Sequence, residues 1–145
     1  MFRWVFRVDY SDTDAMGVAH HASYFRWLER ARIEWLRSMA MPYGELEKEG
    51  YGLPLRAAQI EYKRPLRFDD EAEISVWTEE IGRAGLKLGY RVRLGEAEVA
   101  TAITDHVLCK RGEKDGQVTW TATRIPDEWR NLWLRQSAAK SSTSP

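Results

Sequence analysis

The sequence predicts an α+β domain in which one long helix is wrapped by a curved antiparallel sheet of five to six strands. One segment, residues 23–40, carries apolar residues at the helical period, while the chain after residue 55 alternates apolar and polar residues. The turns between these alternating runs are short, whereas a parallel pair of strands needs a crossover of a dozen or more residues. The runs are therefore antiparallel neighbours, and the one apolar helix has to be covered by the sheet that they form.

Residues 2–10 form the first predicted strand, and residues 11–21 form a loop. Every second residue of the strand is large and apolar, namely Phe2, Trp4, Phe6 and Val8. The loop has no period, and its Gly17 permits a turn with positive φ.

The long helix is predicted over residues 23–40. At 100° per residue, one face gathers the side chains of Tyr24, Trp27, Leu28, Ala31, Trp35 and Met39, and Phe25 and Leu36 widen it. Ser23 is the expected N-cap of this helix. Pro42 lies just past its end, where a proline cannot continue the helix.

A connector over residues 42–54, with one helical turn, leads to the later strands. These are predicted at 55–66, 71–81, 86–94 and 97–111, followed by a short edge strand at 117–123. A terminal helix is expected at 125–133, because Pro126 suits a first turn and the next two residues are acidic. Residues 1–135 are thus predicted to form one domain, and the polar tail 136–145 to be disordered.

Composition narrows the class of protein. The 145 residues are 43% hydrophobic and 30% charged, and 22 basic residues balance 22 acidic ones. This zero net charge argues against nucleic acid as a partner. No apolar run reaches the length of a membrane span, about 18 residues, and charges from Arg3 to Asp9 interrupt any signal-peptide core. The lone Cys109 cannot close an internal disulfide, so we expect a cytoplasmic protein without membrane insertion.

The loop before the long helix holds four polar candidates for chemistry: Asp12, Asp14, His20 and His21. A calcium-binding loop that began at Asp12 would put Met16 and Ser23 at ligand positions, which excludes it. A phosphoaspartyl enzyme would need a parallel sheet. Adjacent histidines diverge and lack a third ligand at a usual spacing, so we predict no metal site.

The two aspartates differ in context. For Asp12 the simplest role is an Asx-turn or exposure to solvent. Asp14 lies between an aromatic strand and an apolar helix, where desolvation raises the basicity of a carboxylate. Free N–H groups at the helix start can polarise a carbonyl oxygen beside it. Composition does not separate His20 from His21, and structural roles are expected for His106 and Cys109 within a strand.

The stretch YSDTDAMGVAHHASY from Tyr10 to Tyr24 is followed by ERAR at 29–32, YKRP at 62–65 and DD at 69–70. This series resembles the hot-dog fold thioesterases of the 4-hydroxybenzoyl-CoA thioesterase class, especially the bacterial acyl-CoA thioesterases associated with the Tol-Pal system. The resemblance spans roughly residues 3–130. It implies a hot-dog fold in chains that pair as homodimers or homotetramers, with sites at the dimer interface.

The resemblance also implies the site residues. The essential carboxylate of the family matches Asp14, its histidine matches His21 rather than His20, and a further tyrosine matches Tyr10. Basic residues that hold the coenzyme A phosphates are expected at Lys63, Arg64 and Arg83, with Lys87 and Arg124 as further candidates.

We therefore expect an acyl-CoA thioesterase without a cofactor, coenzyme A being part of the substrate. Asp14 would attack the thioester carbonyl directly or activate water as a general base, and N–H groups near His21 would hold the carbonyl oxygen. Tyr10 and His21 would orient Asp14 or the water. The alternative is a non-catalytic protein that binds acyl-CoA or acyl-carrier protein, and a third option is a hot-dog dehydratase. The sequence does not specify the acyl group.

Overall fold

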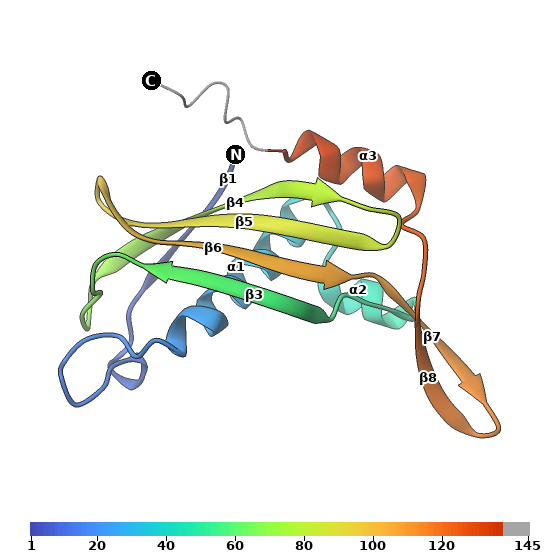
Figure 1. Ribbon diagram of the computed structural model, residues 1–145, viewed down its shortest axis with the longest axis horizontal. Helices are drawn as coiled ribbons and strands as arrows, with labels where there is room; N and C mark the ends of the chain where they lie inside the picture. The colour runs from blue at the N-terminus through green and yellow to red at the C-terminus, as the bar shows by residue number, and fades with distance from the viewer. Residues whose placement is uncertain (138–145) are drawn as a thin grey trace.

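The computed structural model describes residues 1–137, and Figure 1 shows the order of its helices and strands. The elements are β1 (Phe2–Arg7), a 3-10 turn η1 (Tyr10–Asp12), α1 (Ser23–Ser38), α2 (Tyr43–Lys48), β2 (Tyr51–Gly52), β3 (Leu55–Tyr62), β4 (Glu71–Ile81), β5 (Gly85–Leu94), β6 (Ala97–Val107), β7 (Cys109–Lys114), β8 (Gln117–Ala122) and α3 (Asp127–Arg135).

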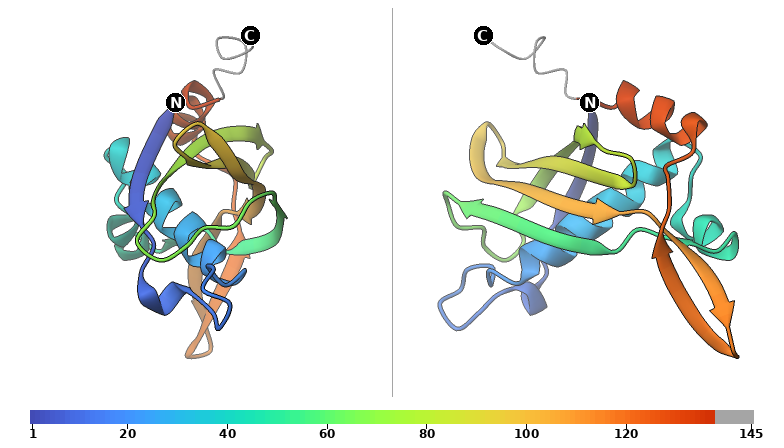
Figure 2. Two further views of the ribbon diagram at one scale, coloured as in Figure 1. Left: turned by 90° about the vertical axis from the view of Figure 1, so that its left-hand side faces the viewer. Right: turned by 45° about the vertical axis from the view of Figure 1, so that its right-hand side comes forward.

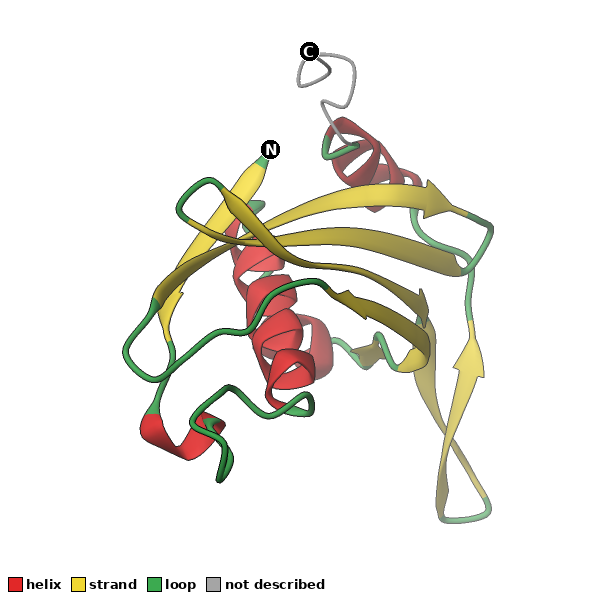
Figure 3. Cartoon of the chain, turned by 60° about the vertical axis from the view of Figure 1, so that its left-hand side comes forward, coloured by secondary structure: helices red, strands yellow, loops and turns green. Residues whose placement is uncertain are grey.

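The main sheet has five strands in the order β1-β4-β5-β6-β3, and every neighbouring pair is antiparallel. The sheet curves around α1, which lies along its concave side (Figures 2 and 3). The predicted α+β class and the helix wrapped by one antiparallel sheet are confirmed.

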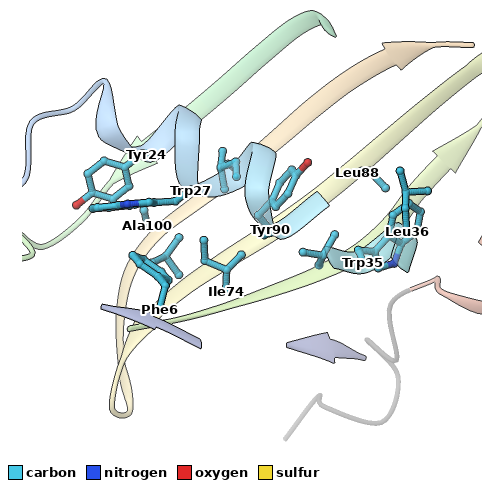
Figure 4. Close-up of a cluster of buried hydrophobic side chains, with 14 of the residues drawn as sticks. Phe6, Tyr24, Trp27, Trp35, Leu36, Ile74, Leu88, Tyr90 and Ala100 are labelled. Carbon is cyan, nitrogen blue, oxygen red and sulfur yellow. The ribbon is translucent and has the colours of Figure 1, made fainter. Parts of the chain in front are cut away.

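The core forms where α1 meets the concave face of the sheet. Most of the apolar face predicted for the helix is buried, and Trp35 and Leu36 have no exposed surface. Figure 4 shows Tyr24 and Trp27 near the start of the helix, where Trp27 packs on Phe6 of β1, and Trp35 and Leu36 further along the helix. In β1 and β5, the more buried residues largely alternate with the less buried ones, as the period-two pattern of the sequence predicts. Phe25 is the exception on the helix, because 43% of it remains exposed.

The run predicted as one strand at 97–111 is two strands. Leu108 lies outside both strands, and its N–H group donates to the carbonyl of Ala84, in the turn before β5, at 2.8 Å. Beyond this break, β7 pairs with β8 and with the short β2, forming a second sheet of three strands. The hairpin of β7 and β8 extends past the end of the main sheet (Figure 1). The predicted edge strand at 117–123 belongs to this second sheet.

The start of α1 corrects one prediction. Ser23 is the first residue of the helix and not its N-cap, because Ala22 before it already has helical backbone angles. The Ser23 hydroxyl donates to the carbonyl of Asp12 at 2.8 Å. This contact ties the helix start to the preceding loop.

The end of the described chain is attached to the sheet. The carbonyl of Gln136 accepts the N–H of Thr78 at 2.9 Å, so residues 136 and 137 of the predicted tail lie beside β4. The rest of that tail, 138–145, lies outside the described residues. Within residues 1–137 no helix is long and apolar enough to cross a membrane.

Candidate active site

A cavity of about 390 Å³ opens where the loop before α1 meets the end of β3. Its lining residues are Asp14, Ala19, His21, Tyr24, Tyr62, Lys63, Arg64 and Pro65. Four of the six predicted site residues, namely Asp14, His21, Lys63 and Arg64, therefore share one cavity. They come from two segments that lie about 40 residues apart in the sequence.

Backbone hydrogen bonds fix the shape of the loop. The N–H of Asp14 donates to the carbonyl of Val18 at 2.9 Å, and Gly17 closes the turn between them with a φ of 80°. The N–H of Ala19 donates to the carbonyl of Leu66 at 2.7 Å. The second bond holds the loop against the segment that follows β3, which brings the two halves of the cavity together.

The Asp14 side chain is half-buried. Its Oδ1 accepts the N–H of Met16 at 2.8 Å, which is the hydrogen bond of an Asx-turn. Its Oδ2 accepts no hydrogen bond from any described residue. One oxygen is thus fixed by the backbone, and the other is available to a substrate or to water.

Asp12 differs from its predicted role. It does not face solvent, because only 7% of it is exposed. Its Oδ2 accepts the N–H of Asp9 at 2.9 Å, and its Oδ1 forms an ion pair with Arg26 of α1 at 2.9 Å. Asp12 therefore joins the 3-10 turn to the helix, and the Asx-turn expected of it is made by Asp14.

The N–H groups at the start of α1 are mostly occupied. The N–H of Ala22 donates to Nδ1 of His20 at 3.0 Å, and the N–H of Ser23 donates to the carbonyl of His20 at 2.9 Å. The N–H of Tyr24 reaches the His21 carbonyl at a long 3.4 Å. The N–H of His21 itself has no acceptor within residues 1–137. Of the backbone N–H groups predicted to hold the carbonyl oxygen, only that of His21 is therefore fully free among the described residues.

The two histidines are not equivalent. His20 accepts a hydrogen bond through Nδ1, which gives it a structural role at the helix start. Its ring stacks on that of His21, with 4.1 Å between the ring centres. His21 is exposed and lines the cavity.

Two tyrosines complete the cavity. The Tyr62 hydroxyl donates to the carbonyl of His21 at 3.1 Å, and its ring lies edge-on to Tyr24 with 5.0 Å between centres. Burial, with a smaller contribution from Tyr62, raises the pKa of Tyr24 to about 12, so this phenol stays neutral. Sequence reasoning did not single out Tyr62. The only signal was its place at the start of the YKRP segment.

The two basic residues of the cavity differ in their pairing. Lys63 Nζ lies 2.6 Å from Oε2 of Glu98, and this hydrogen bond lowers the pKa of the Glu98 carboxyl. The Arg64 side chain makes no hydrogen bond or ion pair with any described residue. Arg64 is the guanidinium available to an anionic group in this cavity.

Two predicted residues lie elsewhere. Tyr10 is 77% exposed and packs edge-on against Phe68 at 5.7 Å, outside the lining of the cavity. Arg83 lies in the turn between β4 and β5, at the opposite end of the main sheet from Lys63 (Figure 1). The further candidate Arg124 is paired with Asp127 at 2.9 Å.

Within the described chain, no group of three or more His, Cys, Asp or Glu side chains is placed to hold a metal ion. The residues that line the cavity include Asp14 with one free carboxylate oxygen, His21 with an unused backbone N–H and Arg64 with an unpaired guanidinium. Such a set can polarise a carbonyl group, deliver an oxygen nucleophile to it and hold an anion nearby.

Comparisons with known proteins agree with this chemistry. The model of the thioesterase-like superfamily matches residues 8–133. The chain is 42% identical over 98 residues to the acyl-CoA thioester hydrolase YbgC of Escherichia coli, covering 68% of this chain and 72% of the relative. It is 31% identical over 110 residues to the acyl-CoA thioesterase YbgC of Haemophilus influenzae, covering 72% and 81%. A solved structure of a hypothetical protein from Aquifex aeolicus matches with a TM-score of 0.83 and 35% identity, covering 92% of this chain and 99% of that chain.

Proposed function

Because the chain belongs to the thioesterase-like superfamily, we propose that it hydrolyses acyl-CoA thioesters at the cavity beside α1, with Asp14 as the reacting carboxylate. Membership of this family confirms the prediction of a thioester-hydrolysing enzyme. The observation that carries the proposed mechanism is that Asp14, which has one free carboxylate oxygen, and His21, which has an unused N–H, line the same cavity.

In this mechanism the thioester carbonyl oxygen accepts the N–H of His21. Negative charge that develops on this oxygen is stabilised by a donor already fixed by the fold. Oδ2 of Asp14 either attacks the carbonyl carbon, giving a mixed anhydride that water then hydrolyses, or removes a proton from an attacking water. Both routes release the carboxylic acid and coenzyme A. The ring of His21 is proposed to orient Asp14 or the water, whereas Tyr10, which lies outside the lining of the cavity, is given no part in this chemistry.

Coenzyme A carries phosphates, and we propose that Arg64 and Lys63 bind them. A planar guanidinium with no protein partner is suited to phosphate recognition. Arg83 lies too far along the sheet to join them within one chain. In the proposed pairing, Arg83 of a second chain takes this place.

We propose that two chains pair through β3. This strand ends the main sheet, and seven of its eight residues are exposed. Leu55 and Tyr62, at its two ends, are 52% and 45% exposed, so the open edge also presents apolar surface. Such an edge is a template for pairing with another strand. Antiparallel pairing of the two β3 strands sets the start of one beside the end of the other.

This pairing places Arg83 of the partner subunit near the cavity. Leu55 at the start of β3 is level with His106 on β6 and with Leu86 on β5, three residues after Arg83. The turn that holds Arg83 is therefore two strands from the start of β3, about 10 Å. A homodimer, or a homotetramer built from two of them, would thus bring Arg83 toward Lys63 and Arg64.

The motif from Tyr10 to Tyr24 supports a more specific assignment to the Tol-Pal-associated branch, and with it a cytoplasmic location. Both proposals concern where the protein acts in the cell and do not alter the chemistry proposed for the cavity.

The test of the function is thiol release from short-chain, long-chain and aromatic acyl-CoAs by the purified protein. We expect multiple turnovers with at least one class. If every acyl-CoA binds in calorimetry and none is hydrolysed, the alternative of an acyl-CoA or acyl-carrier-protein binding protein replaces the enzyme. Hydration of an enoyl-CoA without thiol release would instead favour the dehydratase.

A further inference from the structure

A second cavity, of about 210 Å³, lies between α1 and strands β5 and β6. Tyr90, Thr104 and His106 line its inner part and are 1%, 5% and 2% exposed. Arg32 of α1 lines the same cavity and is only 7% exposed. The candidate active site uses none of these residues.

Arg32 is a buried cation with no partner in the described chain. Its Nη1 is sealed from solvent and has no hydrogen-bond acceptor. The guanidinium lies over the ring of Tyr43, at 5.5 Å from the ring centre. Glu29, one helical turn earlier, lines the same cavity without forming an ion pair with Arg32. A buried guanidinium without an anion is energetically costly, which points to a ligand that supplies the anion.

The other polar groups of the cavity are engaged with one another. Nδ1 of His106 lies 3.3 Å from the carbonyl of Leu53, which can only accept, so the proton is on Nδ1. Nε2 then accepts the hydroxyl of Thr104 at 2.8 Å, and Thr104 accepts the hydroxyl of Tyr90 at 2.7 Å. Burial, together with the charge of Arg32, lowers the pKa of His106 to about 4, so the ring is neutral. No anion is left within this chain of bonds to pair with Arg32.

The two cavities lie along one side of the same helix. His21 lies two residues before α1, and Phe25, Leu28 and Arg32 follow it in a stripe along one side of the helix, on successive turns. Phe25 and Leu28 line the second cavity and make the stripe between the two sites apolar. At a rise of 1.5 Å per residue, Arg32 lies about 14 Å along the helix axis from Ser23, the first residue of α1. An acyl chain held at the His21 N–H can therefore run along this stripe toward Arg32.

We propose that Arg32 binds a terminal carboxylate of the acyl group, so that the preferred substrates are thioesters of dicarboxylic acids. This inference rests on the proposed thioesterase function and names the substrate class of the same site. The guanidinium presents a planar set of donors that matches a carboxylate. Tyr90 and His106 line the same cavity as Arg32.

The experiment compares acyl-CoAs of equal chain length that end in a methyl group or in a carboxylate, such as octanoyl-CoA and suberoyl-CoA. The quantity measured is the ratio of kcat/KM for the carboxylate-ended substrate to that for the methyl-ended one. We expect this ratio to fall by about 10- to 100-fold in Arg32→Met, because a charge-assisted hydrogen bond to the carboxylate is lost. Arg32→Lys should recover part of it.

Arg37→Met is the matched control, since Arg37 lies on the same helix, is exposed and pairs with Glu34. It should leave the ratio unchanged. A second readout does not depend on turnover, because free suberate should raise the melting temperature of the wild type and not that of Arg32→Met.

The outcomes separate the two proposals. If neither substrate is hydrolysed, the thioesterase function is wrong. If both are hydrolysed and Arg32→Met leaves the ratio unchanged, the function stands and the carboxylate site is overturned. A change of oligomeric mass in Arg32→Met with an unchanged ratio would assign the buried charge to a side chain of a second copy.

Discussion

At the scale of single residues, the two aspartates of the Asp12-Thr13-Asp14 segment have different surroundings. Asp12 is buried, bonded to the Asp9 backbone and paired with Arg26, so both of its oxygens are used. Asp14 uses one oxygen in its Asx-turn and keeps the other free. The sequence could not show this difference, because the partner of Asp12 lies 14 residues further on and meets it only in the folded chain.

The free N–H of His21 leads to a residue-level prediction. His21→Pro removes both the ring and the N–H, whereas His21→Ala removes only the ring. Relative to His21→Ala, we expect His21→Pro to lower kcat by about 100- to 1000-fold, as loss of one oxyanion donor does. Steady-state kinetics on a common acyl-CoA measures the difference, and circular dichroism checks that both variants fold.

Ala22→Pro is the control for the proline substitution. The φ of Ala22 is −68°, which suits a proline ring, and its N–H already donates to His20. This variant should therefore cost much less activity than His21→Pro. Equal losses in the two variants would mean that the His21 N–H is not the donor.

His106 predicts a pH dependence of stability. Its pKa is about 4 in the folded protein, below the ordinary 6.5, because burial and Arg32 disfavour its charged form. Between these two values the unfolded chain binds a proton that the folded chain does not. The free energy of unfolding therefore decreases as the pH falls from 6.5 to about 4. The total decrease is roughly 3 kcal/mol.

Urea unfolding at pH 7 and pH 4 tests this prediction. The wild type should lose roughly 3 kcal/mol more than His106→Gln, in which nothing titrates at this position. The carboxylates that titrate in this range are common to both proteins and cancel in the comparison. An equal loss in the two proteins would show that His106 does not titrate as described.

At the scale of elements, prediction succeeded where the pattern was local. The strand predicted at 71–81 is found unchanged as β4, and β5 begins one residue before its predicted start. The buried face of α1 was also predicted from its helical period. The break at Leu108 was not, because it depends on hydrogen bonds of Leu108 to Ala84 and to Thr123, which are distant in sequence. The two-residue β2 is too short to carry a pattern of its own.

The packing of β4 on β5 gives a prediction at this scale. Gly89 lies on the side of β5 that faces Trp77, and a Cβ at this position would overlap the indole ring. The indole is held by a hydrogen bond from its Nε1 to Glu79 at 2.6 Å. We expect Gly89→Ala to destabilise the protein by about 1–3 kcal/mol, as overpacking does.

Gly85→Ala on the same strand is its control. A Cβ there would meet nothing closer than the His106 carbonyl at 3.8 Å, an ordinary contact. Thermal unfolding should show a clear drop for Gly89→Ala and a much smaller one for Gly85→Ala. Similar melting temperatures would contradict the packing described for Trp77.

At the scale of the whole molecule, the predicted site is only partly assembled in one chain. Residues of the motif from Asp14 to Tyr24 and of the YKRP segment line one cavity. Arg83 lies at the other end of the sheet and Tyr10 lies outside the cavity. The sequence does not show these two positions, because they depend on how the strands are arranged in the folded chain.

The open edge of β3 therefore predicts the mass of the particle. With a chain of 16.9 kDa, sedimentation equilibrium should give two or four times this mass. Pairing buries an exposed strand edge and its apolar ends, which favours association. A monomer at micromolar concentration would contradict the proposed pairing and leave Arg83 without a role in binding coenzyme A.

The central claim is that Asp14 carries the hydrolysis of an acyl-CoA thioester, and the most direct test compares Asp14→Asn with Asp12→Asn. Thiol release is measured for both on the best substrate of the wild type, together with the melting temperature. Asp14→Asn should lose at least about 100-fold in kcat with little change in melting temperature, because its free oxygen is needed for the reaction and not for the fold. Asp12→Asn should show the reverse, a lower melting temperature with most of the activity retained. Full activity in Asp14→Asn would contradict the account.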